Sequence, residues 1–302
     1  MDLRQLNALL AVADHGSFST AARSLHTVQS NVSAHVARLE KEVGATLIDR
    51  STGTLTEEGV VVATRARRIQ AELAALDSDV ASLRDEVVGR VRLGVIGTTA
   101  RWLVPPLMMA MASRHPRVRV VIVDATTSSL LPQLEVGRID LAVLNLPVHD
   151  PDLVSEMLFE EDTILLAPTD HPLAQHADIA FADLAGHPLL LEPEGTTFRD
   201  VLDEQAARAG FELEAQAEVD GMRLLASLAF QGFGATLVPA SAAPASLQGE
   251  WVRIPVVGVQ GRVVGLATRR RGMASASGRA LRDVLVEVIA READGQTGIH
   301  LP

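Results

Sequence analysis

The chain has no cysteine and no tyrosine among its 302 residues, and aromatic residues make up only 3% of it. Without cysteine, disulfides, thiol redox sensing and cysteine-ligated zinc are excluded. So few aromatic rings leave little on which the bases of single-stranded nucleic acid could stack. No run reaches the roughly 20 apolar residues that a membrane helix requires. The N-terminus lacks the basic start and unbroken apolar core of a signal peptide, so we expect a cytoplasmic protein.

The net charge of −11 argues against a protein that coats nucleic acid over its whole surface. The charge is uneven, because residues 1–70 carry eight basic and seven acidic side chains while the acidic excess lies in residues 71–302. A DNA-binding N-terminal end is therefore compatible with the composition. With 47% apolar residues, a chain of this length can bury the cores of two or three domains.

Residues 17–44 predict two short helices joined by a tight turn. The second helix has a buried stripe at intervals of 4, 3 and 4, formed by Val32, Val36, Leu39 and Val43. Ser17 and Thr27 stand where hydroxyl N-caps would begin the two helices. The opposite face of the second helix is polar, with Gln29, Ser30, Asn31, Ser33, His35 and Arg38. The pattern predicts a helix-turn-helix whose second helix enters the DNA major groove, or else an ordinary helical hairpin with a solvated face.

The segments on either side extend this unit. Residues 3–14 predict a first helix that packs across the pair, and the run after Gly44 predicts a two-stranded wing with a Ser-Thr-Gly turn. Arg50 in that wing is placed either to meet a phosphate or to pair with Glu57 or Glu58.

Residues 62–87 predict one long helix. Its apolar positions alternate at intervals of 4 and 3, and they are Val62, Ala66, Ile69, Leu73, Leu76, Val80, Leu83 and Val87. A lone helix would leave this seam in water, so we expect it to pack against the same helix of a second subunit. The alternative is that it packs on its own downstream domain.

From residue 91 the pattern changes to β-branched runs that alternate with helical segments, which predicts an α/β fold with mostly parallel sheets. Strands are expected at 91–96, 118–125, 139–147, 162–167, 188–191, 213–219 and 235–238. We expect two lobes that divide near residue 160 and are recrossed near residue 266. Ligands in such sheets bind beyond the carboxyl ends of the strands. Those ends supply Thr98, Thr99, Thr127, Ser128, Asn145, Thr196, Thr197, Phe198, Val219 and Met222.

The N-terminal phrase LRQLNALLAVADHGSFSTAARSLHTVQSNVSAHVARLEKEVGATLIDR, followed by LTEEG, resembles the winged helix-turn-helix of the LysR-type transcriptional regulators. GRVRLGV, MMAMASRHPRV, GRIDLAV and GFGATLVP are similar to later phrases of that family. The resemblance implies a DNA-binding domain at 1–58, a dimerising linker helix at 59–89 and a two-lobed, periplasmic-binding-protein-like effector domain at 90–302. Lobe I would comprise about 90–160 and 267–302, and lobe II about 161–266.

The same resemblance assigns roles to residues. Gln29 and Ser33 match base-reading and phosphate-contacting positions, and Arg50 matches a wing arginine. Ser30 replaces a frequent proline and Ala34 a frequent arginine, and STGT replaces a basic wing tip. Fewer cations predict a shallower salt dependence, at about 0.9 in the slope of log K against log salt per phosphate contact. Base readout would then depend on Gln29, Asn31, His35 and Arg38, in a dimer that binds an inverted repeat of double-stranded DNA.

In the effector domain, the resemblance implies that the inducer cleft is lined at Thr98, Thr127, Asn145, Thr196, Thr197, Phe198 and Met222. The helix that opens at Thr98 and Thr99 favours an anion, although at least one of these hydroxyls is expected merely to cap that helix. Asn145 replaces a cation found in relatives. We therefore expect a small carboxylate with one charge, or a neutral polar metabolite, and a homotetramer that responds to it.

Other function classes have weaker support. The chain lacks the His-Glu-x-x-His, Gly-x-Ser-x-Gly and phosphate-loop signatures, so we expect no enzyme, no cofactor and no metal. His171 and His176, near Asp170 and Asp178, have neither helical nor finger spacing and fit a solvated loop better than a metal cluster. The main alternative is a solute-binding protein with no DNA role. The effector, the operator and the sign of regulation stay open.

Overall fold

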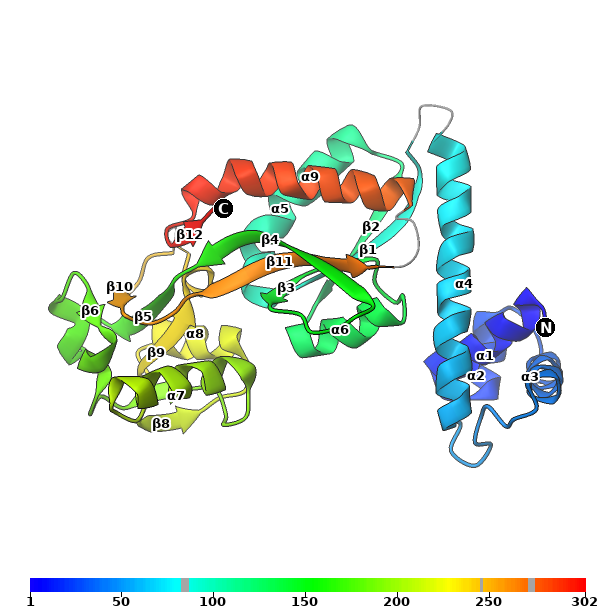
Figure 1. The fold of residues 1–302 in the computed structure, drawn as a ribbon, viewed down its shortest axis with the longest axis horizontal. Helices are drawn as coiled ribbons and strands as arrows, with labels where there is room; N and C mark the ends of the chain where they lie inside the picture. The colour runs from blue at the N-terminus through cyan, green and yellow to red at the C-terminus, as the bar shows by residue number, and fades with distance from the viewer. Residues whose placement is uncertain (83–86, 245–246, 271–274) are drawn as a thin grey trace.

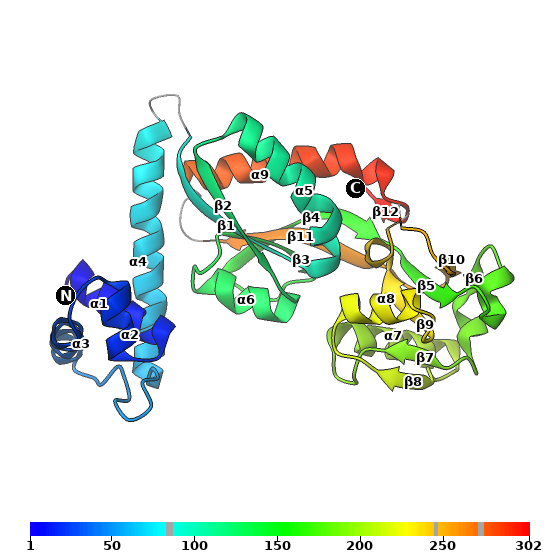
Figure 2. The same cartoon turned by 180° about the vertical axis from the view of Figure 1, so that it is seen from behind.

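The computed structural model describes residues 1–82, 87–244, 247–270 and 275–302. It shows a helical N-terminal domain, a long helix and two α/β lobes in a row (Figures 1 and 2). No helix in the described ranges is long and apolar enough to span a membrane.

The N-terminal domain is built from α1 (Leu3–His15), α2 (Phe18–Ser24), α3 (Gln29–Val43) and the start of α4 (Glu57–Ser82). Their apolar faces close one core, with Leu9, Val36 and Leu39 fully buried. Ser17 caps α2 as predicted, since its hydroxyl accepts from the Thr20 amide at 3.2 Å. The prediction for Thr27 is wrong: Val28 precedes α3 without a side-chain cap, and the Thr27 hydroxyl accepts from the Asn31 side-chain amide instead, at 3.0 Å.

Two further expectations for this region need correction. The wing is reduced to a single antiparallel bridge between Ile48 and Leu55, because the chain turns tightly between them. The described part of the long helix runs to Ser82, and the helix does not include Val87, which lies in irregular chain and lines a hollow beside α5 and α9. Leu83, the remaining position of the predicted seam, lies outside the described residues.

The first lobe contains a six-stranded sheet in the order β12-β4-β11-β3-β1-β2. Its strands are β1 (Gly89–Val95), β2 (Val118–Asp124), β3 (Leu141–Leu146), β4 (Leu153–Glu161), β11 (Arg262–Arg269) and β12 (Ile299–His300). Helices α5 (Gly97–Arg114) and α9 (Ala276–Glu292) cover one face, and α6 (Thr127–Glu135) covers the other (Figures 1 and 2).

The second lobe contains a sheet in the order β6-β10-β5-β9-β7-β8. Its strands are β5 (Thr163–Pro168), β6 (Ile179–Ala180), β7 (Leu189–Leu191), β8 (Ala215–Glu218), β9 (Ala235–Pro239) and β10 (Trp251–Val257). Helices α7 (Thr197–Ala209) and α8 (Met222–Phe230) follow β7 and β8. Short 3₁₀ turns lie at Pro172–Gln175, Phe181–Leu184, Ala240–Ala242 and Ala293–Gly295.

The lobes differ from expectation in two respects. Each sheet is mixed rather than mostly parallel, because β4, β5, β10 and β11 run antiparallel to neighbours. The chain recrosses between β10 and β11, at 258–261 instead of near 266, because Arg262–Arg269 pairs with β3 and β4 in the first sheet. Two connections, from β4 to β5 and from β10 to β11, thus join the lobes, and we call this region the hinge.

Candidate DNA-binding face and effector cleft

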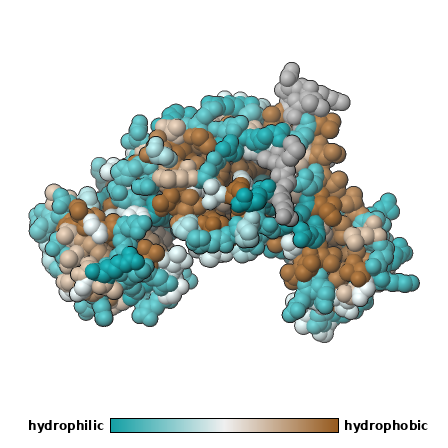
Figure 3. Space-filling view, in the orientation of Figure 1, coloured by the Kyte–Doolittle hydropathy of each residue, from teal (hydrophilic) through white to brown (hydrophobic). Residues whose placement is uncertain are grey.

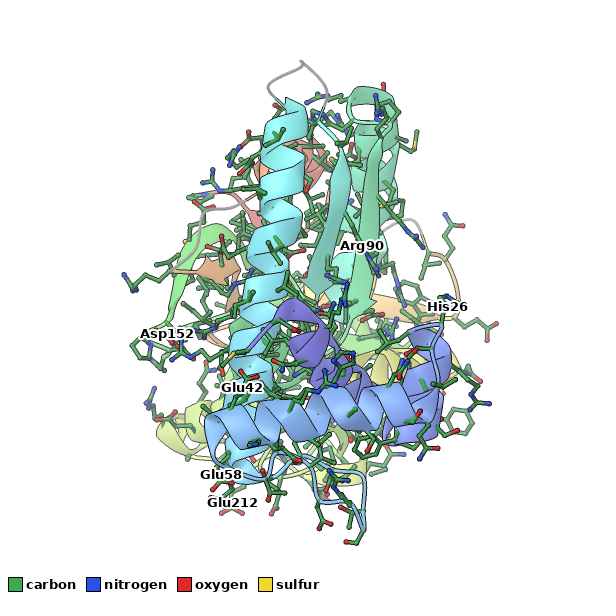
Figure 4. The ribbon with its side chains drawn as sticks, turned by 90° about the vertical axis from the view of Figure 1, so that its right-hand side faces the viewer. His26, Glu42, Glu58, Arg90, Asp152 and Glu212 are labelled. Carbon is green, nitrogen blue, oxygen red and sulfur yellow. The ribbon has the colours of Figure 1, made fainter. Side chains whose placement is uncertain are left out.

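The outer face of α3 is exposed. Figure 4 shows α3 lying across the near side of the N-terminal domain, with His26 at one end and Glu42 at the other. Gln29, Ser30, Asn31 and Arg38 are exposed on this helix. Val32, Val36 and Leu39 of the predicted stripe are turned into the core, but the prediction is wrong for Val43, which is 36% exposed at the C-terminal end of the helix. Polar side chains are therefore presented to solvent on a helix that packing holds rigid.

His35 does not share this outer face. It is half-buried, its ring Nδ1 is buried without a hydrogen-bond partner, and it lies near Asp2. The pKa of Asp2 is lowered mainly by the hydrogen bond from the Gln5 amide, and the His35 charge contributes. Ser33 is also half-buried. The structure thus places His35 near Asp2 at the start of α1, on a flank of α3 rather than on its outer face.

Arg50 is held beside the recognition helix. Its guanidinium pairs with Glu40 of α3 at 3.3 Å and lies over the Phe18 ring at 5.9 Å. The alternative partners Glu57 and Glu58 do not hold it. Glu40 also accepts hydrogen bonds from the backbone amide of Leu47 at 2.9 Å. More than half of the Arg50 side chain stays exposed, so the guanidinium remains accessible to a phosphate.

His26 is a feature that sequence reasoning missed. It lies in the turn before α3 with φ of 51°, a left-handed conformation that non-glycine residues rarely adopt. Its side chain is exposed at the N-terminal end of α3 (Figure 4). Histidine in a turn carries no periodic signal, which is why the pattern of apolar residues did not indicate it.

The predicted effector residues gather at the carboxyl edges of the two sheets. Those of the first lobe follow β1 and β2, except for Asn145, which lies near the end of β3, and those of the second lobe follow β7 and β8. The two edges face each other, because Arg223 of α8 pairs with Asp124 at the end of β2 at 2.7 Å. The same guanidinium lies over Gly97, where an added Cβ would come within 3.2 Å of Nε. An ion pair thus joins the two lobes beside the predicted effector residues.

Thr98 belongs to a second polar cluster, at the hinge. Arg262 donates to its hydroxyl at 2.5 Å and pairs with Glu161 at 2.6 Å. The Glu161 side chain is fully buried and also accepts from the Ser241 amide at 2.5 Å. The cluster therefore ties β4, β11, α5 and the second lobe together.

Thr98 and Thr99 do not cap α5, contrary to expectation. Ile96 occupies the N-cap position without a side-chain hydrogen bond. Thr99 is fully buried and its hydroxyl has no partner. The side-chain oxygen of Asn145 and the indole nitrogen of Trp102 are likewise buried without partners in the first lobe. Three polar atoms around the start of α5 and the end of β3 are therefore unsatisfied by the protein itself.

The remaining predicted residues differ in exposure. Thr127, Thr196, Phe198, Val219 and Met222 are half-buried, whereas Ser128 and Thr197 are exposed. Phe198 packs against one core cluster of the second lobe and Met222 against the other. These two side chains therefore combine a structural role with their place at the cleft.

Glu192 is a cleft residue that sequence reasoning missed. It follows β7, and its pKa is raised first by burial and then by Asp220. The charge of Arg262 opposes this rise, which places Glu192 within electrostatic reach of the hinge cluster. Only the fold brings Glu192 close to Arg262, so no local pattern could have indicated the pair.

The histidine loop is structural in the described chain. The His171 ring accepts from the Leu173 amide at 3.2 Å, and its centroid lies 5.6 Å from that of His187. Burial, and then His187, lower the His171 pKa. Within the described ranges, no group of three metal-ligating side chains comes together.

Comparison with known proteins agrees with this architecture. Residues 3–60 match the family model of the bacterial regulatory helix-turn-helix protein, lysR family, and residues 84–290 match the LysR substrate binding domain. A probable hydrogen peroxide-inducible genes activator of Mycobacterium leprae is 33% identical over 301 residues, covering 95% of this chain and 94% of the relative. The Escherichia coli K12 transcriptional dual regulator OxyR is 29% identical over 246 residues, covering 81% of each chain.

Solved structures share the fold over nearly the whole chain. A full-length OxyR variant from Pseudomonas aeruginosa superposes with a TM-score of 0.76 at 25% identity, covering 96% of this chain and 94% of that one. CbnR in complex with its target DNA superposes with a TM-score of 0.68 at 25% identity, covering 97% and 100%. A solute-binding protein without a DNA role is therefore excluded. The chain belongs to the LysR family of DNA-binding transcriptional regulators, with an N-terminal helix-turn-helix and a two-lobed effector domain, and it is not an enzyme.

Proposed function

We propose that this chain regulates transcription in the cytoplasm by reading an inverted-repeat operator through α3, under the control of a small molecule that binds between the lobes. That molecule is neutral or carries a single negative charge, as a small monocarboxylate does. The observation that carries the choice is the pairing of the cleft arginines. Arg262 is paired with Glu161 and Arg223 with Asp124, while Glu192 and Asp220 add negative charge.

A dianion that binds Arg262 or Arg223 would have to displace these ion pairs. Removing one partner from a buried pair is strongly unfavourable, so the cluster around Glu161 would resist such a ligand. The buried, unpartnered oxygens of Thr99 and Asn145 and the Trp102 nitrogen instead suit a neutral group that both donates and accepts hydrogen bonds. The name of the Mycobacterium leprae relative refers to hydrogen peroxide, but a cysteine-free chain cannot respond to it through a thiol.

The oligomer in this proposal is a dimer formed through α4, and two such dimers form a tetramer. Near the N-terminal end of α4, the seam residue Ala66 is buried against the N-terminal domain. The seam residues farther along α4 are exposed: Ile69 by 41%, Leu73 by 42%, Leu76 by 61% and Val80 by 53%. Figure 3 shows apolar surface gathered along α4. An apolar stripe of this length calls for a covering partner, and a second copy of the same helix matches its spacing.

Thermal unfolding of the full chain against a panel of small molecules tests the effector class. The panel pairs neutral amides and alcohols and monocarboxylates with dicarboxylates of the same carbon skeleton. A binder at about 100 times its Kd stabilises the protein by about 2.7 kcal/mol. We expect stabilisation by neutral or monoanionic members and none by their dicarboxylate counterparts. Selective stabilisation by dicarboxylates would refute the proposal.

A further inference from the structure

Helix α6 reaches from the effector cleft to the DNA-binding domain. It begins at Thr127, one of the cleft residues, and ends at Glu135. Nine helical residues span about 13 Å at 1.5 Å per residue. Figures 1 and 2 both show α6 below the sheet of the first lobe, between the second lobe and α4. One short rigid element therefore has an end at each functional region.

The cleft end of α6 is fixed to the sheet. The Thr127 hydroxyl accepts a hydrogen bond from the Asn145 backbone amide at 3.0 Å, and the Thr126 hydroxyl caps the helix. Thr127 follows β2 and Asn145 lies near the end of β3, on the edge that faces the second lobe. A ligand that contacts either residue therefore acts directly on the start of α6.

The other end of α6 is docked onto the linker helix and onto α1. Arg68 of α4 donates to the Glu135 carbonyl from two nitrogens, each at 3.2 Å. Arg138, just beyond α6, pairs with Asp14 of α1 at 3.0 Å. Asp14 also pairs with Arg67 of α4, at 2.6 Å. One carboxylate of the DNA-binding domain therefore joins the linker helix to the end of α6.

The end of α6 is also tied to its own sheet. Arg269 of β11 donates to the carbonyls of Leu134 at 3.0 Å and of Ile139 at 2.8 Å. By contrast, the ion pair of Asp14 and Arg138 is about half-exposed, and such pairs contribute at most about 1 kcal/mol. The pair of Asp14 and Arg138 is thus weak enough for a ligand's differential affinity to break or form it. It also leaves the outer face of α3 free (Figure 4).

We propose that α6 couples the two functional regions: occupation of the cleft moves its Thr127 end, and its Arg138 end then changes how Asp14 docks the DNA-binding domain. This inference rests on the proposed effector cleft. A ligand-dependent change in the contact between Asp14 and Arg138 would set the orientation of α3 relative to the first lobe. The affinity of one α3 for one half-site would stay the same.

Amide hydrogen exchange on the full chain tests this coupling without DNA and without the effector. Arg138→Gln removes the docking pair, and Arg208→Gln is the matched control, because it removes an exposed ion pair of α7 with Glu204. We expect Arg138→Gln to speed exchange of the Asn145 amide severalfold, although that amide lies at the opposite end of α6. Arg208→Gln should leave the exchange rate of the Asn145 amide unchanged. Unchanged exchange of the β1 amides in both variants would show that global stability is intact.

The reverse experiment starts at the cleft. Thr127→Val keeps the side-chain shape and removes the hydroxyl, and we expect faster exchange of the Arg138 and Ile139 amides, which donate to the Gln133 carbonyl. If Arg138→Gln and Thr127→Val each speed amide exchange only at their own end of α6, the proposed coupling is wrong. Failure of the wild-type chain to bind DNA upstream of its own gene would instead refute the proposed operator, whatever the exchange data show.

Discussion

The recognition face of α3 and the effector cleft use their polar side chains differently. On α3, Gln29, Ser30 and Arg38 project into solvent from a helix whose other side is locked in the core. In the proposed effector cleft, Arg262 is paired with Glu161 at the hinge, and Arg223 is paired with Asp124 between the lobes. The α3 face can therefore bind DNA without first breaking contacts within the protein. In the proposed cleft, a ligand that binds either arginine must first break an ion pair. This difference suits a regulator whose DNA-contacting side chains stay in place while effector binding rearranges the contacts between the lobes.

The largest expected effect comes from breaking the hinge cluster. Glu161→Ala leaves Arg262 without its counter-ion in a site where the Arg262 side chain is 14% exposed. We expect a loss of about 3–5 kcal/mol in the free energy of unfolding, because an unpaired charge stays buried. The control is Arg223→Ala, whose pair with Asp124 is largely exposed and should contribute less than about 1 kcal/mol. Thermal or denaturant unfolding measures both variants. Equal losses of unfolding free energy would contradict the expected difference between the buried pair at the hinge and the more exposed pair of Arg223 and Asp124.

Two glycines with similar φ angles, Gly53 and Gly44, test how tightly the turns around α3 are packed. Gly53 has φ of 74°, and an added Cβ would come within 2.2 Å of the Gly16 carbonyl oxygen. Gly44 has φ of 79° and open space around it. Gly44→Ala should cost about 1–2 kcal/mol from backbone strain alone, and Gly53→Ala more than about 3 kcal/mol because of the added overlap. Circular dichroism during unfolding measures both, and similar losses would show that the Gly53 turn is not tightly packed.

A smaller effect sharpens the description of the cleft. Burial raises the Glu192 pKa, so the folded state favours the protonated carboxyl and is penalised once pH exceeds the raised value. Glu192→Gln should therefore stabilise the chain at pH 7 by up to about 1 kcal/mol, a figure reduced for partial solvent exposure. The gain should vanish below the ordinary Glu pKa of 4.5, where both forms are neutral. Unfolding curves at pH 7 and pH 4 check this, and a gain of equal size at both would contradict it.

Local patterns predicted the parts of the fold that they determine. The stripe of Val32, Val36 and Leu39 specified the buried side of α3, and β-branched runs specified β1, β2 and β3. Strand β4 was missed because LVSEMLFEE mixes polar and apolar residues without alternation, and its pairing with β11 and β12 comes from distant chain. β11 was missed too, which moved the expected second crossing to 266.

The site was less predictable than the fold. Strand ends indicated Thr98 and Asn145 as cleft residues, since topology places them at one edge. The partners of those residues were not foreseeable, because Arg262, Glu161 and Glu192 meet only through the hinge. His35 fell on the polar side of the sequence pattern but on the flank of the folded helix, beside Asp2. A stripe predicts the centre of a helical face well and its edges poorly.

Binding of the full chain to duplex DNA from upstream of its own gene is the most direct test of the preformed α3 face. Fluorescence anisotropy would compare wild type, Gln29→Ala and the cleft variant Thr196→Ala, each against a scrambled duplex. Loss of one good base contact removes about 1–3 kcal/mol of discrimination. We predict that Gln29→Ala loses that preference for the operator while Thr196→Ala keeps it without effector. Wild-type discrimination by Gln29→Ala, or its loss in Thr196→Ala, would contradict the account.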